Sequence, residues 1–155
     1  MTEENIPAIS QWSSDFQRGK VTPRDALEFC LTRIDRLDDK LGAFEVVYEH
    51  EARQAADAAT NAFDSGHRIG PFHGIPFALK DIIDLEGRIT TGGSKVFEDR
   101  VSPATATVAK RLIAAGGILV GKTKTVEVAM GGWGTNQQMG TPWNPWDLKT
   151  HRTPG

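Results

Sequence analysis

Several features that define other protein classes are scarce in this sequence of 155 residues. It has one cysteine, Cys30, so it can form no internal disulfide, a usage typical of a reducing compartment. Lysine and arginine total 18 against 20 aspartate and glutamate, a net charge of −2 without the basic excess of nucleic-acid-binding domains. The four histidines show no metal-ligand spacing. We therefore expect no metal, no cofactor and no direct contact with nucleic acid.

Long hydrophobic runs are also absent from the sequence. The opening residues, MTEENIPAIS, lack the basic segment and apolar stretch of a secretory signal. The one long uncharged window, residues 128–146, is rich in Gly, Asn, Gln and Pro, which a bilayer core would not accept unless their polar groups were satisfied. We interpret this window as a buried or cleft-lining loop and predict a cytoplasmic protein that enters no membrane.

The spacing of apolar residues predicts an α/β layered core. Segments with apolar residues every three or four positions are expected to be helices at 7–18, 23–41, 51–63 and, starting from Ser102 and Pro103, up to Gly116. Short β-branched or apolar runs predict strands at 43–48, 75–79 and 118–120. The run at 75–79 does not alternate, so both of its faces are expected to be buried. We expect no closing helix or strand at the end of the chain.

The stretch GGILVGKT, residues 116–123, matches the phosphate-loop pattern G-x-x-x-x-G-K-[ST] letter for letter. A phosphate loop needs glycine-rich backbone after a strand and before a helix, because bare N–H groups wrap the phosphates. Here a helix is expected to end at Gly116, and three of the four intervening residues are strand formers. The context therefore argues against a nucleotide site. Lys122 is expected at a strand end, where it could pair with Glu127.

Lys80, in the stretch GPFHGIPFALKD, is the first charged residue after Arg68 and follows an apolar strand. Burial at such a place would disfavour the charged amine and lower its pKa, which would let it accept a proton. Taken alone, an amine that reaches solvent or pairs with Asp81 is the simpler interpretation. His73 in the same stretch is expected to be a structural hydrogen-bonding residue, and Cys30 a buried thiol on a helix stripe.

Four motifs in succession closely resemble the first part of the amidase signature family: GPFHGIPFALKD, TTGGS, AAGGILVGKTKTVEVAMGGWGTN and GTPWNPWD. The resemblance covers about residues 70–155, and the preceding helices fit the N-terminal region of that family. It implies an α/β/α layered fold with a mixed sheet flanked by helices. Residues 1–155 would be the N-terminal fragment of one amidase domain, with 1–70 mainly helical and 71–155 starting the catalytic core.

The family resemblance also implies a mechanism. The lysine of the family's LKD motif is catalytic, which makes Lys80 the catalytic candidate. It works with a bridging serine in a cis peptide and a nucleophilic serine, both from a Gly-Gly-Ser-Ser-Gly-Gly region that normally follows Pro-Gly. This sequence reaches Pro154-Gly155, so the resemblance places both serines past residue 155 and implies that residues 1–155 alone are inactive. The complete chain would hydrolyse linear carboxylic amides by metal-independent Ser–cisSer–Lys chemistry.

The segment AMGGWGTN supplies candidate substrate-binding residues, because it is low in bulk and has one aromatic wall. They are Met130, Gly131, Gly132 and Trp133. The family places this region near the acyl pocket for a small-molecule amide, although a surface turn explains each residue equally well. Trp143 and Trp146 are expected to pack in the core.

Two further interpretations stay open. The amidase component of a tRNA-dependent amidotransferase shares these motifs, although GGWGTN is closer to free-standing amidases than to the Ser-Thr-Glu version usual in that component. The other is a non-catalytic scaffold or interaction module. The particular amide and the oligomeric state are not set by the sequence, and a homodimer stays open.

Overall fold

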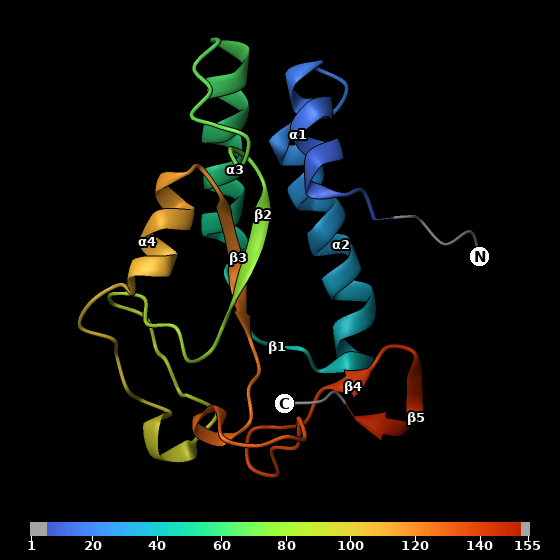
Figure 1. The fold of residues 1–155 in the computed structure, drawn as a ribbon, viewed down its shortest axis with the longest axis vertical. Helices are drawn as coiled ribbons and strands as arrows, with labels where there is room; N and C mark the ends of the chain where they lie inside the picture. Colours follow the sequence, from blue (N-terminus) through green and yellow to red (C-terminus); the bar gives the residue numbers. More distant parts are fainter. Residues whose placement is uncertain (1–5, 153–155) are drawn as a thin grey trace.

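The computed structural model describes residues 6–152. Its elements follow in this order: α1 (Ile9–Gln17), α2 (Pro23–Leu41), β1 (Phe44–Val47), α3 (Glu49–Asp64), β2 (Pro76–Lys80), η1 (Lys95–Phe97), α4 (Thr107–Ala114), β3 (Ile118–Thr123), η2 (Glu127–Ala129), β4 (Trp143–Asn144) and β5 (Asp147–Arg152). The two η elements are short stretches of 3-10 helix. Helices surround a small central sheet, and the loops after β2 and β3 gather near its lower end in the view of Figure 1.

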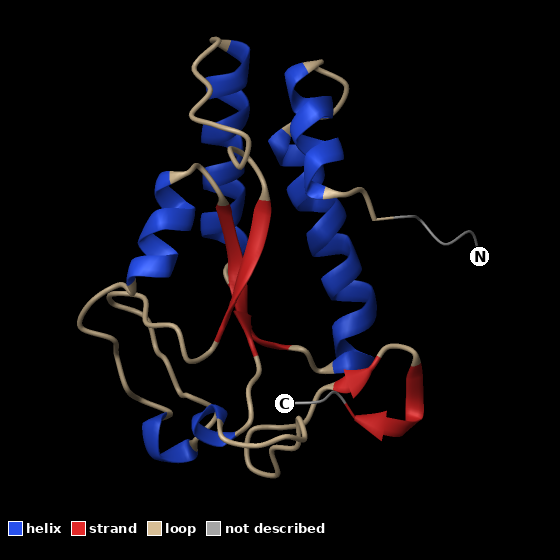
Figure 2. Ribbon diagram, in the orientation of Figure 1, coloured by secondary structure: helices blue, strands red, loops and turns tan. Residues whose placement is uncertain are grey.

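The central sheet has the strand order β1-β3-β2. β2 and β3 are parallel and are connected through α4, whereas β1 runs antiparallel to β3. Helices α2 and α3 pack with Ile118 and Val120 on one face, and α4 packs with Leu79 and Leu119 on the other. Figure 2 shows this layering of helices around the strands. The expected mixed sheet flanked by helices is confirmed.

The second helix begins where its sequence predicts. Thr22 Oγ1 accepts the N–H of Asp25 at 3.1 Å, and the Asp25 carboxylate accepts the N–H of Thr22 at 2.9 Å, which forms a capping box. The backbone N–H and the hydroxyl of Thr22, both of which donate to this carboxylate, lower the pKa of Asp25. Gly42 ends α2 in the left-handed conformation, with φ of 58°. The buried alanines of α3, Ala52, Ala56 and Ala59, let α3 approach α2 closely.

Three expectations about the elements are wrong. Helix α4 begins at Thr107 rather than at Ser102, because the Ser102 hydroxyl is buried in hydrogen bonds with other loops. β5 pairs with β4 in a hairpin where no closing strand was expected. Trp146 lies in the connection of that hairpin and is 93% exposed, not packed in the core. Within residues 6–152, no helix is long and apolar enough to cross a membrane.

Candidate active site

Lys80 is the last residue of β2, and its side chain is exposed. Ala78, two residues earlier on the same face, is exposed as well, while Leu79 is buried on the opposite face. A groove of about 230 Å³ lies between α2 and β2 and is lined by Ala78. Helix α2 therefore leaves this face partly open. The expected burial of both faces is wrong, and residues 6–152 do not enclose the amine of Lys80.

The buried amine of this region belongs to Lys122, which is 0% exposed. Its Nζ lies 2.7 Å from Asp81 Oδ1 and donates to the Ile89 carbonyl at 2.9 Å and to Thr90 Oγ1 at 2.5 Å. An ammonium has three donors, and these three acceptors use all of them. The pairing expected between Lys122 and Glu127 is therefore wrong. Asp81 pairs with Lys122, and of the two simpler interpretations of Lys80, contact with solvent is the one that the structure shows.

An irregularity in β3 brings Lys122 to this place. Phe77 of β2 is paired with Leu119, but the next residue, Ala78, is paired with Gly121, so one extra residue bulges from β3. Lys122 then lies opposite Leu79, on the sheet face that Asp81 continues. Glycine is required at position 121, since a Cβ there would collide with the carbonyl oxygen of Val46 on β1.

Every polar group of Asp81 has a partner. Its N–H donates to the carbonyl of Thr123 at 2.9 Å, and its own carbonyl accepts the N–H of Gly92 at 2.9 Å. Its Oδ2 accepts the N–H and the hydroxyl of Thr91, at 3.0 and 2.5 Å. The end of β2 is thus tied both to β3 and to the TTGGS turn.

A second polar cluster continues from Thr90. Ser102 Oγ donates its one hydrogen to Asp84 Oδ1 at 2.8 Å, and a second hydrogen bond of 2.8 Å joins the hydroxyls of Ser102 and Thr90. Arg100 donates to both carboxylate oxygens of Asp84 at 2.8 and 3.1 Å. The Arg100 guanidinium, helped by Ser102, lowers the pKa of Asp84 to about 2. The loop from 84 to 102 is therefore closed on itself over Lys122.

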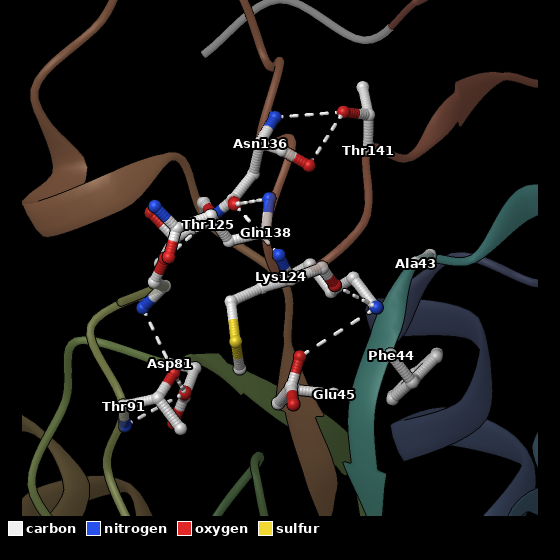
Figure 3. Close-up of polar contacts among 12 residues, drawn as sticks. Ala43, Phe44, Glu45, Asp81, Thr91, Lys124, Thr125, Asn136, Gln138 and Thr141 are labelled. Carbon is white, nitrogen blue, oxygen red and sulfur yellow. Dashed lines mark hydrogen bonds and ion pairs between the residues drawn. The ribbon is translucent and has the colours of Figure 1, made fainter. Parts of the chain in front are cut away.

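Asn136 connects the TTGGS turn to the loop that follows η2 (Figure 3). Its Nδ2 donates to the carbonyls of Gly93 and Thr125 at 2.6 and 3.1 Å. Its Oδ1 accepts the backbone N–H groups of Gln138 and Met139 at 3.1 and 2.9 Å. Both ends of one buried amide thus shape this loop.

A cavity of about 540 Å³ lies beside Asp81, and Glu45, Arg88 and Met139 contribute to its lining. Burial raises the pKa of Glu45, against the lowering effect of Lys124, whose Nζ lies 3.8 Å from Glu45 Oε2. Lys124 also donates to the carbonyl of Met139 at 2.5 Å (Figure 3). The cavity presents a carboxyl group and a guanidinium, which suits a polar small molecule.

The candidate substrate-binding segment is open to solvent. Met130 and Trp133 are 83% and 79% exposed, and Gly131 and Gly132 are exposed too. Just before them, Val128 has a left-handed backbone, with φ of 48°. The burial expected for residues 128–146 is therefore wrong for most of the large side chains, although Asn136 is buried and Met139 contributes to the lining of the cavity beside Asp81.

The remaining candidates have structural contacts. His73 is buried, accepts the N–H of Ile69 at Nδ1, 3.2 Å away, and packs against the Phe63 ring, as expected of a structural residue. Burial lowers its pKa, helped by the charge of Arg68. Cys30 is half-buried, and burial raises the pKa of its thiol to about 11, which makes it a poor nucleophile. The described part of the chain holds no cluster of three or more potential metal ligands.

Comparisons with known proteins agree with this arrangement. A family model described as Amidase matches residues 25–155. The chain belongs to the amidase family. It is 38% identical, over 159 aligned residues, to a Glutamyl-tRNA(Gln) amidotransferase subunit of Streptomyces avermitilis, an alignment that covers 100% of this chain and 31% of the relative.

Solved structures in the family have the same fold. A crystal structure of an amidase matches with a TM-score of 0.87 and 30% identity, over 96% of this chain and 34% of that one. The peptide amidase from Stenotrophomonas maltophilia matches with a TM-score of 0.75 and 27% identity, over 85% of this chain and 28% of that one. The chain thus spans about a third of the length of such relatives, and the resemblance seen in the motifs is confirmed.

Proposed function

We propose that this chain forms one side of an amide-hydrolysing active site in which Lys80 transfers protons. The observation that carries the proposal is the position of Lys80 at the carboxyl end of β2, beside the parallel β3, within the stretch that matches the amidase family. In α/β folds, ligands bind outside the carboxyl ends of parallel strands. The exposed side chain also leaves the amine accessible to reacting groups.

The family resemblance supplies the proposed steps. A neutral Lys80 amine accepts a proton from a bridging serine, which takes one from the nucleophilic serine as the latter attacks the amide carbonyl. The protonated lysine returns the proton through the same hydroxyl to the leaving nitrogen, because an amine leaves poorly unless it is protonated. Water then repeats the cycle on the acyl-enzyme. In the family both serines come from a Gly-Gly-Ser-Ser-Gly-Gly region, a stretch that residues 1–155 do not contain.

A base at position 80 needs shelter from bulk water, because desolvation is what favours the neutral amine. Residues 6–152 leave Lys80 exposed. We therefore propose that further protein or the bound amide covers it. Contact of Met130, Gly131, Gly132 and Trp133 with the acyl group belongs to the same proposal, as do a cytoplasmic location and a homodimer.

The test uses the protein encoded by the whole open reading frame that contains these residues. Ammonia release is measured from acetamide, benzamide, glutamine and a C-terminal peptide amide. We expect Lys80→Ala to lower kcat by roughly 10²–10⁴-fold, the usual contribution of a positioned acid–base group. Lys110→Ala, an exposed lysine on α4, is the matched control. A Lys80→Ala enzyme of nearly normal rate would remove this residue from the mechanism.

A second candidate function is that of an amidotransferase subunit. It is favoured by curated relatives named as subunits of Glutamyl-tRNA(Gln) amidotransferase, two of which are 42% identical over 87% of this chain. In that case glutamine should be the amide hydrolysed, and Glu-tRNA(Gln) should change the rate of its hydrolysis. A rate that is independent of that tRNA, together with turnover of simple amides, supports the free-standing amidase instead.

A further inference from the structure

We propose that the buried Asp81–Lys122 ion pair positions Lys80, without touching the substrate. This inference rests on the proposed function, in which Lys80 transfers protons. Asp81 follows Lys80 directly in the chain, so whatever fixes the backbone of Asp81 also fixes the direction in which the side chain of Lys80 leaves β2.

The contacts around Asp81 are unusually complete. Its backbone N–H and carbonyl bind Thr123 and Gly92, and its two carboxylate oxygens bind Lys122 and Thr91. These partners come from β3 and from the TTGGS turn, on two sides of the strand end. The residue after Lys80 is therefore clamped between elements that are distant in sequence, while Lys80 itself projects freely.

Burial separates this role from catalysis. The side chains of Lys122 and Asp81 are only 0% and 2% exposed, so neither can meet a substrate. All three donors of Lys122 are also engaged. An apolar pair of similar volume is often as stable as a buried ion pair, so stability alone does not account for charges at this place. Holding the end of β2 in one orientation accounts for the charges.

The experiment is a double-mutant cycle in the protein from the whole open reading frame. Asp81→Asn with Lys122→Met removes both charges, keeps an oxygen for Thr91 and retains the volume of the lysine stem. The same two substitutions are also made in the Lys80→Ala enzyme. Its residual rate is measured with whichever of the four test amides the unaltered protein hydrolyses fastest. Lys110→Met, in both backgrounds, is the control.

A positioning role predicts a specific pattern of rates. With Lys80 present, neutralising the pair should lower kcat at least tenfold with little change in KM. With Lys80 already removed, the same change should alter kcat less than twofold, because no amine is left to position. Should the double variant fail to fold, Thr91→Val, which keeps the ion pair and removes only the hydroxyl that donates to Asp81, enters the same cycle.

The contrary outcomes are distinct. An equal loss of kcat in both backgrounds indicates a purely structural pair and overturns the inference, as does an unchanged kcat. Where the Lys80→Ala enzyme is too slow to measure, the dependence of kcat on pH is compared between the wild type and the Asp81→Asn, Lys122→Met variant. Displacement of Lys80 should move the pH at which kcat is half-maximal. A loss of folded protein would instead lower kcat by the same factor at every pH, and that result overturns the inference. A Lys80→Ala enzyme of nearly normal rate instead overturns the proposed function itself.

Discussion

At the scale of single residues, the charged groups of this chain differ in how far they are buried, and burial decides which of them can meet other molecules. Lys80 reaches solvent from the end of β2, whereas Lys122 is enclosed with every donor occupied. Asp84 is intermediate: its side chain is 34% exposed, yet Arg100 and Ser102 donate to it. A charge that is held in this way makes folding stability depend on pH.

We expect Asp84→Asn to flatten the acid side of the stability profile. The pKa of Asp84 is lowered from 3.8 to about 2 in the folded protein, so its contribution is fully present above pH 4 and is lost as pH falls towards 2. Urea unfolding between pH 6 and pH 2 should show the wild type more stable at the upper end and the difference vanishing at the lower end.

Asp35→Asn, at an exposed position on α2, is the matched control for this experiment. The difference in free energy of unfolding between the wild type and Asp35→Asn should be the same at pH 6 and at pH 2. A difference between wild type and Asp84→Asn that stays constant down to pH 2 would contradict the assigned role of Asp84.

At the scale of elements, a single side chain organises the loop after η2. The Oδ1 atom of Asn136 holds residues 136–139 together, and the Nδ2 atom of the same side chain ties them to Gly93 of the TTGGS turn and to Thr125 after β3. The TTGGS turn in turn binds Asp81 at the end of β2. The loop that carries the candidate substrate-binding residues is therefore mechanically linked to the strand that carries Lys80.

We expect Asn136→Asp to loosen this loop while leaving the helices intact. The carboxylate could still accept from Gln138 and Met139, but its second oxygen would face the carbonyls of Gly93 and Thr125 instead of donating to them. Hydrogen exchange and limited proteolysis should both become faster between residues 131 and 141.

The same chemical change at an exposed helical position, Asn61→Asp on α3, provides the control and should leave the loop unaffected. Equal protection of the loop in wild type and Asn136→Asp would mean that other contacts hold it.

At the scale of the whole molecule, local signals predicted the elements well and the contacts between them poorly. Thr22 and Pro23 marked the start of α2, since capping depends on neighbours in sequence. The partner of Lys122 depended instead on a bulge in β3, which no local pattern announces. The one available signal of this ion pair was that Lys122 lies in an apolar run and that Asp81 follows another predicted strand. The exposure of Lys80 depends on what covers β2, which its own residues do not encode.

The layering also predicts where the fold opens first. β3 lies between two strands with buried side chains on both faces, whereas β5 is paired with the two-residue strand β4. Amide hydrogen exchange should therefore be slowest in β3 and fastest in the β4–β5 hairpin. Slower exchange in β5 than in β3 would show that the hairpin is covered by other parts of the protein.

The bulge in β3 has a chemical consequence. In a regular ladder, continuing the pairing of Phe77 with Leu119 would set Lys122 directly beside Lys80, where two like charges repel each other. The carboxylate of Asp81 would then lose its cation. One additional residue in a strand thus separates two identical side chains: Lys122 enters the buried ion pair with Asp81, and Lys80 lies on the exposed face.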